Sequence, residues 1–462
     1  MRIAAKFEAW RIANLPNMHV GVHISTYPDL KTQAGQEPKR RDLLRRLVRN
    51  QWLVGDQALV SAMNFLTSAI LARMLGVHDF GVFSVFYILL QYLNSIQLAL
   101  IVSPMMTLAP QIAQKSERTT FLKGMSGYQF IFSAVSCLLA LLLALLLPIA
   151  EKINLVRTKI VPGILFPFAL TIFCFQAQDW MRRLWYVEER GRAVFVNDVI
   201  SYFGQVIVLL ILWQTRTASV RSAYYAVALT SLAAFLVGLK GEEAWATLRQ
   251  IKTVARKTWS FGRSLLVASQ FQWVGSQGIL IIVAAISGVN AAGGIRAVMA
   301  LLGPVNVLYQ LLDNVIPVRA ARAFARSGKA GLLAYLRRVG LLLYVLVGLP
   351  VLLITIAAKP IMALAFGKAF AGFSHLVFWQ AIYVMLALLY KGLQYYHRTM
   401  GSVAVLARSA LVVSVTSVGS CIVLSRHYGA TGAMIALVIG QILNVGIPLR
   451  AVLFARANEA RA

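Results

Sequence analysis

The chain has 462 residues, of which 59% are hydrophobic, and its mean hydropathy is +0.71. A water-soluble domain cannot bury that much apolar surface, so the composition indicates an integral membrane protein. The formal net charge of +29 does not indicate nucleic-acid binding, because the 45 Lys and Arg residues are dispersed between apolar stretches and form no single patch.

Cysteine and histidine usage argues against a disulfide framework and a metal site. Cys137, Cys174 and Cys421 all lie inside apolar stretches, where cysteine is typical of a small core residue. The six histidines are scattered and none has ligand spacing. We therefore expect no metal and no cofactor.

Residues 1–50 form a basic, polar N-terminal arm without the apolar core of a signal peptide. Its last part places Leu43, Leu44, Leu47 and Val48 on one helical face, with arginines on the other. That pattern is typical of an interfacial helix on anionic lipid, and equally of a basic cluster that only sets topology.

Twelve apolar stretches follow, each long enough to cross a bilayer. They cover residues 53–72, 82–104, 124–147, 160–179, 195–213, 223–239, 262–286, 295–317, 339–358, 374–396, 403–424 and 430–451. The predicted fold is an all-α polytopic membrane protein with about 12 transmembrane helices in two parallel six-helix halves around a central cavity. The halves are 51–240 and 262–452, joined by a cytoplasmic linker at 241–261 and followed by a cytoplasmic tail at 453–462.

Basic residues set the orientation of these spans. If the N-terminus is cytoplasmic, 35 of the 45 Lys and Arg residues fall on the cytoplasmic side. The positive-inside rule favours this orientation, and an even number of spans places both termini in the cytoplasm.

The two halves resemble each other in sequence. At an offset of 212 residues, Gly76, Gly81 and Asn94 match Gly288, Gly293 and Asn306, and after a one-residue slip Gln97 and Pro104 match Gln310 and Pro317. Six spans separate the copies, so both insert in the same sense. This is a parallel repeat about an axis along the membrane normal, an architecture found in transporters.

Polar side chains form stripes along several spans. Span eight carries Asn306, Tyr309, Gln310, Asp313 and Asn314; span two carries Tyr87, Gln91, Asn94 and Ser95; span one carries Asp56, Asn64 and Thr67. We interpret the stripes as the lining of a water-accessible cavity between the halves. Hydrogen bonding between packed helices is the alternative.

Charged residues within or near the spans have two interpretations each. Arg73, Arg296, Lys391 and Arg408 either face the cavity or extend to the membrane interface. Asp313 either binds a coupling ion or pairs with an arginine such as Arg319. Asp179 and Asp198 are expected to pair with the arginines of the nearby loop, Arg182, Arg183 or Arg192.

Three short segments resemble polysaccharide flippases. Asn64-Phe65, the run ILARMLG at 70–76 and Asp79-Phe80-Gly81 are similar to the first-helix signature of that family. The runs AFGKAF at 365–370 and YGATGA at 428–433 fit it as well. The family belongs to the multidrug/oligosaccharidyl-lipid/polysaccharide exporter superfamily.

The resemblance implies that the protein flips a polyprenyl-pyrophosphate-linked oligosaccharide from the cytoplasmic to the periplasmic leaflet of the bacterial inner membrane by alternating access. Partners would be this lipid-linked oligosaccharide and membrane lipid, with a polysaccharide polymerase and chain-length proteins as further candidates. Candidate substrate-binding residues are Arg73, Asn94, Arg296, Asn306, Gln310, Lys391 and Arg408, and candidate ion-coupling acids are Asp313 and Asp56.

Two other functions compete with this one. A cation-coupled exporter of the multidrug and toxin extrusion type is expected to carry buried acids, and only Asp56 and Asp313 lie well within the first and eighth spans. A membrane enzyme, such as a polysaccharide polymerase or lipid-linked glycosyltransferase, needs catalytic acids or a large outer loop. The outer loops contain only Asp79 and Glu151 as acids, and we expect no enzymatic activity.

The topology is open to a direct test. Reporter fusions after residues 50, 116, 188, 250 and 328 should report cytoplasm, and those after 154, 218 and 427 should report periplasm, because the charge asymmetry retains the basic segments inside. A periplasmic signal at 250 or 328 would contradict the six-plus-six arrangement.

Overall fold

The computed structural model describes residues 40–152, 162–239 and 246–459. The chain forms two compact units, Met1–Gln51 and Trp52–Ala462, and the helix packing and the cavity belong to the second. Its described residues are helical with short connections and contain no strand. Residues 1–39, and with them most of the basic arm, lie outside the described part.

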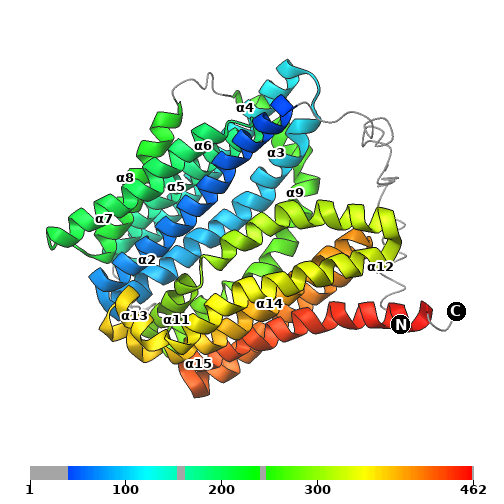
Figure 1. Ribbon diagram of the computed structural model, residues 1–462. Helices are drawn as coiled ribbons and strands as arrows, with labels where there is room; N and C mark the ends of the chain where they lie inside the picture. The colour runs from blue at the N-terminus through cyan, green and yellow to red at the C-terminus, as the bar shows by residue number, and fades with distance from the viewer. Residues whose placement is uncertain (1–39, 153–161, 240–245, 460–462) are drawn as a thin grey trace, which may run out of the picture. The chain divides into compact units, whose positions relative to one another are not determined.

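The helices follow one another with few loops (Figure 1). In chain order they are α2 (Arg40–Gln97), η2 (Leu98–Val102), α3 (Ser103–Leu108), η3 (Ala109–Gln111), α4 (Lys115–Lys152), α5 (Pro162–Val187), α6 (Gly191–Asp198), η4 (Val199–Phe203), α7 (Gly204–Gln214), α8 (Val220–Leu239), α9 (Leu248–Ser276), α10 (Ile279–Ser287), α11 (Val289–Leu301), α12 (Val305–Ile356), α13 (Ala358–Phe366), η5 (Lys368–Phe373), α14 (His375–Thr399) and α15 (Val403–Glu459). The segments η2 and η4 are π-helical turns; η3 and η5 are 3₁₀ turns.

The described residues contain eight helices long and apolar enough to cross a membrane, or nine if the bent pair α9 and α10 counts as one. Two of these, Gly55–Gln111 and Ala404–Phe454, have 57 and 51 residues, far more than the roughly 20 that one crossing requires. Each contains a glycine with a left-handed φ, Gly76 (75°) and Gly429 (55°), and so supplies two crossings. With the bent pair, the described residues thus supply eleven crossings; the remaining predicted span, 295–317, falls on the end of α11 and the start of α12. The all-helical fold class is confirmed.

The same backbone device recurs at the equivalent place of each half. Gly76 has φ 75° and ψ 180°, and its repeat partner Gly288 has φ 85° and ψ 164°. Side-chain-bearing residues rarely adopt these angles, because the Cβ would collide with the neighbouring backbone. The repeat seen in sequence is therefore also a repeat of conformation.

The halves cross at a second pair of repeat-related glycines. A Cβ on Gly81 would overlap the carbonyl oxygen of Val289, and a Cβ on Gly293 would lie 2.8 Å from that of Val77. Val77 and Val289 are themselves repeat partners, so the two contacts are reciprocal, as at a two-fold axis. The axis of the parallel repeat thus runs through this crossing.

Aromatic side chains pack around the same end of the helices. Phe80 meets Phe370 edge to face at 5.7 Å between ring centroids, and Phe65 meets Phe366 at 6.1 Å. Phe80, Phe366 and Phe370 are almost fully buried. Figure 1 shows the bend of α2 beside α13 and α11 at this end. The two halves are therefore in firm contact where the predicted outer side lies.

The close crossing predicts that one methyl group added at Gly81 lowers the stability of the protein. Gly81→Ala should lower the free energy of unfolding by about 1–3 kcal/mol, because the added Cβ has no room against the Val289 carbonyl. Gly340→Ala in α12 is the matched control, since its Cβ would meet nothing within 4 Å, and it should be neutral or stabilising by up to about 1 kcal/mol. Thermal unfolding of the detergent-solubilised protein measures both; equal midpoints would contradict the close crossing.

Candidate functional site

A polar cavity of about 260 Å³ lies between the two halves. It is lined by both arms of α2, by α11 and by the turn that follows α11. The lining residues are Gln57, Val60, Ser61, Asn64, Phe65, Ser68, Tyr87, Gln91, Arg296, Met299, Ala300 and Gly303. Arg296 is the charged residue in this set, and the set includes no carboxylate.

Helical periodicity explains why α2 presents polar groups here. Gln57, Ser61, Asn64 and Ser68 recur every three or four residues and so share one face of the helix. The residues of the stripe predicted on this span lie in different surroundings. Asn64 does line the cavity, but Asp56 is almost fully buried, 1% exposed, and does not line it.

Arg296 connects the halves through the cavity wall. Its guanidinium carbon lies 4.9 Å from the centroid of the Tyr87 ring, a cation–π contact between α11 and the second arm of α2. Gln91 Nε2 donates a hydrogen bond of 3.1 Å to the Tyr87 hydroxyl. The tyrosine thus holds the guanidinium at the cavity wall, where it can meet an anionic group.

Arg73 does not line the cavity. Its Nε donates to the carbonyl oxygen of Ala365 at 3.0 Å, and its Nη2 donates to that of Leu364. These carbonyls belong to the last turn of α13, where free acceptors and the helix dipole attract a cation. Arg73 therefore joins α2 of the first half to α13 of the second at the closed end.

The other predicted substrate-binding residues are dispersed. Asn94 and Lys391 are half-buried, Arg408 is exposed on α15, and none of the three lines the cavity. The side chains of Asn306, Gln310 and Asp313 lie outside the described residues. Their backbone continues α12 just beyond Gly303, which does line the cavity.

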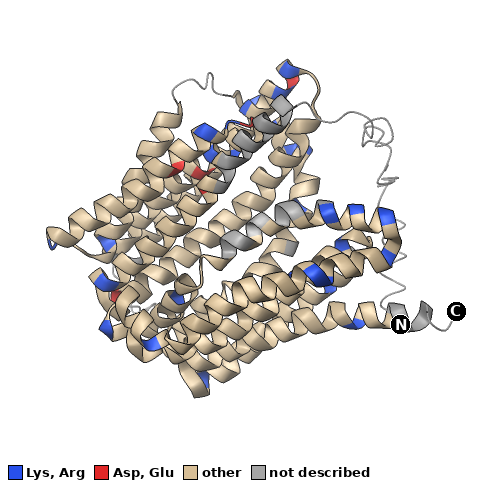
Figure 2. Ribbon diagram, viewed as in Figure 1, with Lys and Arg blue, Asp and Glu red and all other residues tan. Residues whose placement is uncertain are grey.

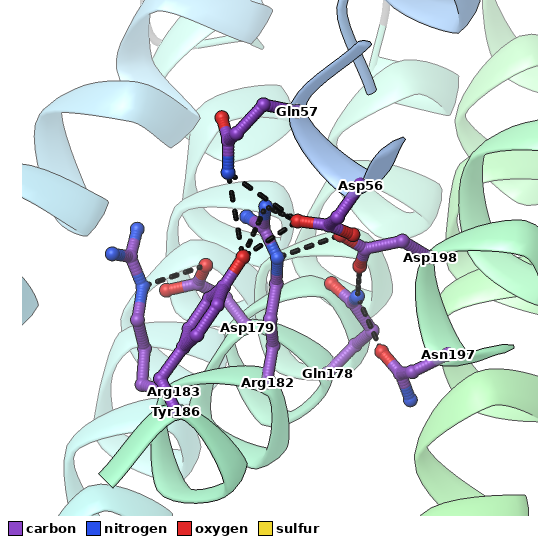
Figure 3. Close-up of polar contacts among 9 residues, drawn as sticks. All are labelled: Asp56, Gln57, Gln178, Asp179, Arg182, Arg183, Tyr186, Asn197 and Asp198. Carbon is purple, nitrogen blue, oxygen red and sulfur yellow. Dashed lines mark hydrogen bonds and ion pairs between the residues drawn. The ribbon is translucent and has the colours of Figure 1, made fainter. Parts of the chain in front are cut away.

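A buried cluster of charges lies behind the cavity wall in the N-terminal half (Figure 3). Arg182 of α5 pairs with Asp198 of α6 (Nε to Oδ2, 2.7 Å) and with Asp56 of α2 (Nη2 to Oδ2, 3.1 Å). The three side chains are 9%, 0% and 1% exposed. Arg182 thus ties three helices together, and Asp198 has one of the partners that the sequence predicted.

Neutral side chains add hydrogen bonds to this cluster. The Tyr186 hydroxyl donates to Asp56 Oδ2 at 2.6 Å. Gln178 Nε2 donates to Asp198 Oδ1 at 3.2 Å and to Asn197 Oδ1 at 2.7 Å. Two carboxylates face one guanidinium, so the ionised cluster would keep one negative charge.

Gln57 links the charge cluster to the cavity. It lines the cavity, and its Nε2 lies 3.3 Å from both Asp56 Oδ2 and the Tyr186 hydroxyl. Neither Gln57 nor Tyr186 is among the residues predicted from the sequence. A signal for Tyr186 existed, because it stands four residues after Arg182 on one helix and so shares its face.

Neither a family model nor a curated relative matches the chain. Its three-dimensional structure is similar to solved structures of transporters. One is the lipid II flippase MurJ in an inward closed conformation, with a TM-score of 0.65, 13% identity and coverage of 88% of this chain and 87% of that one. The chain has the fold of the MOP-superfamily transporters.

Two further solved structures are similar in fold. An inward-facing multidrug resistance MATE family transporter of the MOP superfamily gives a TM-score of 0.67 at 12% identity, covering 87% of this chain and 95% of that one. An outward-facing MATE family transporter gives 0.50 at 12% identity, with 88% and 97% coverage.

The charge cluster predicts a large difference between neighbouring arginines. Arg182→Met should cost about 3–5 kcal/mol of stability, because it leaves two buried carboxylates without their cation. Arg183→Met should cost at most about 1 kcal/mol, because Arg183 is 30% exposed and pairs with Asp179 at 3.4 Å. Thermal unfolding and the yield of folded protein measure the difference; similar losses in both variants would contradict a stabilising role of the cluster.

Proposed function

We propose that the protein is a membrane transporter that flips a polyprenyl-pyrophosphate-linked oligosaccharide from the cytoplasmic to the periplasmic leaflet of the bacterial inner membrane. The main support for this proposal is the chemistry of the cavity between the halves. Its lining residues provide one guanidinium, several amides and hydroxyls, and no carboxylate. This chemistry suits a hydroxyl-rich glycan attached to an anionic phosphate group.

The arrangement of the halves supports an alternating-access cycle. They are in contact at the end that carries Gly81 and Gly293, and the cavity lies between them further along α2. Flipping would require the contacts of Arg73 with α13, and the Phe80–Phe370 contact, to open as the opposite end closes. Similarity to a lipid II flippase adds to the proposal, since that protein's name describes movement of a lipid-linked substrate.

Arg296 is proposed as the principal contact for the anionic group, with Asn94, Asn306 and Gln310 extending the polar path. Arg73, Lys391 and Arg408 remain proposed substrate contacts for other states of the cycle. Taking a phosphate group out of water without a cation would cost several kcal/mol.

Asp56 and Asp313 remain the proposed ion-coupling acids. The negative charge left over in the Asp56–Arg182–Asp198 cluster would be neutralised by one proton or one small cation that arrives from the cavity by way of Gln57. Coupling at this cluster is also what the second candidate function requires, a cation-coupled multidrug exporter. The similarity to MATE family transporters favours that candidate, while the absence of a carboxylate among the cavity-lining residues favours the flippase.

Deleting the gene separates the two candidates. A flippase deletion should abolish one surface polysaccharide, such as an O-antigen or exopolysaccharide, and leave its lipid-linked precursor in the inner leaflet. Extraction and mass spectrometry of polyprenyl-linked glycans measure the amount of precursor that accumulates. Normal polysaccharide together with new sensitivity to cationic dyes would establish the exporter instead.

Complementing the deletion strain with variants tests the role of Arg296 in flipping. Arg296→Gln should lower the flipping rate about tenfold to a hundredfold, because it removes a charge-assisted contact of about 1.5–3 kcal/mol to the anionic group. Lys359→Gln removes one charge from an exposed position of α13 outside the cavity and is the matched control. Equal restoration of polysaccharide by both variants, at equal amounts in the membrane, would refute the role of Arg296.

A further inference from the structure

The helix that connects the two halves begins with a strongly basic segment. Thr247 caps α9, accepting a hydrogen bond from the Gln250 backbone, while the Gln250 side chain accepts one from the Thr247 backbone. Such a capping box fixes the helix start firmly. Residues 248–263 then contain five Lys and Arg and no Asp or Glu.

One face of this segment is docked on α4. Val254, Thr258 and Gly262 are buried and recur every four residues. Gly124 and Gly127 of α4 leave room for the docking: a Cβ on Gly124 would lie 2.6 Å from Val254 Cγ2, and one on Gly127 would lie 2.5 Å from Ile251 Cδ1. Because these two glycines lack a Cβ, the segment packs closely against α4 of the N-terminal half.

The basic residues project from a different side of the helix. At 3.6 residues per turn, Arg249, Lys252, Arg256 and Arg263 fall within about 60° of one another, roughly opposite the buried face. Lys257 lies about 80° from Arg249 around the helix, outside this face, and all five side chains are exposed. Within the described residues no carboxylate forms an ion pair with any of the five. Figure 2 shows the described carboxylates only in the N-terminal half, and α9 itself has none.

Large apolar side chains occupy the sector between the docked face and the basic face. Leu248 is 78% exposed and Trp259 is 51% exposed, and they lie within about 20° of each other around the helix. An exposed tryptophan next to a row of cations is typical of a helix in the plane of a membrane interface, with its apolar side toward the acyl chains.

We propose that the first half of α9 (residues 248–263) is a binding surface for anionic phospholipid headgroups. The docked face fixes the segment to α4, Leu248 and Trp259 enter the boundary of the acyl chains, and the basic face binds phosphates of the lipid surface. Because the orientation predicted from charge places this segment on the cytoplasmic side, the lipids would belong to the inner leaflet. The surface is separate from the cavity and does not depend on the identity of the transported substrate.

The order of the three sectors favours lipid over an acidic protein as the occupant. A protein partner would cover the basic face and leave Leu248 and Trp259 in water. A bilayer can contact both sectors at once, because its acyl chains adjoin its phosphates: the chains would contact Leu248 and Trp259, and the phosphates would contact the basic face. A multi-pass protein is also surrounded by membrane at all times, so lipid can bind this segment without first diffusing to it from solution.

Energy transfer between a dye on α9 and labelled lipid tests the proposal. The full-length protein, with Cys137, Cys174 and Cys421 replaced by Ala, carries a donor dye at Thr253→Cys, an exposed position next to the basic face. It is reconstituted in vesicles of equal parts phosphatidylcholine and phosphatidylglycerol with a trace of acceptor-labelled lipid of either kind. Labelled phosphatidylglycerol should give more transfer than labelled phosphatidylcholine, and added salt should reduce the difference.

Two variants with equal charge loss decide the outcome. Neutralising the α9 face (Arg249→Gln, Lys252→Gln, Arg256→Gln and Arg263→Gln) should reduce the lipid preference at least about tenfold, since each cation near an anionic surface contributes about fivefold. Neutralising four exposed cations of α12 (Arg322→Gln, Arg326→Gln, Arg337→Gln and Arg338→Gln) should leave it unchanged. Equal transfer from both labelled lipids, or the same loss in both variants, would overturn the proposal.

Discussion

Where α2 crosses α11, backbone meets backbone, because neither Gly81 nor Gly293 carries a Cβ. The contact is reciprocal, so the two halves meet about a shared axis, and it lies at one end of the helices only. The aromatic pairs around it and the Arg73 contacts with α13 add to the closure at that end. The position of the cavity follows from this geometry, since helices held together at one end leave space further along.

The two groups of buried polar residues contribute differently to that arrangement. The Arg182 cluster lies within one half and ties three of its helices together, because Arg182 pairs with two carboxylates from different helices. Arg296 and Tyr87 come from opposite halves and meet at the cavity wall. Contacts of the first kind join helices within a half, whereas contacts of the second kind join one half to the other. Gln57 contacts Asp56 and Tyr186 of the first group and lines the same cavity as Arg296 and Tyr87, so it lies between the charge cluster and the cavity.

Much of the fold was predictable from the sequence because the bilayer imposes strong local rules. Apolar length identified the spans, and the repeated glycines identified the relation between the halves, which Gly76 and Gly288 confirm with matching backbone angles. The cavity was only partly predictable. Polar residues on a helix face indicate that the face meets something polar, but not which neighbour that is. Asn64 meets the cavity while Asp56, eight residues earlier, meets Arg182. The position of Arg73 against α13 depends on a contact across 292 residues, which no local pattern contains.

The turns at Gly76, Gly288 and Gly429 have a consequence for what the predicted outer surface presents. In each, one glycine with a left-handed φ interrupts helical structure that resumes at the next residue, so no extended loop is present there. Proteases, antibodies and phage receptor-binding proteins engage extended or protruding chain, and a one-residue turn offers them little. Because these turns are so short, an inserted epitope would interrupt helix, so the turns are poor positions for external tags.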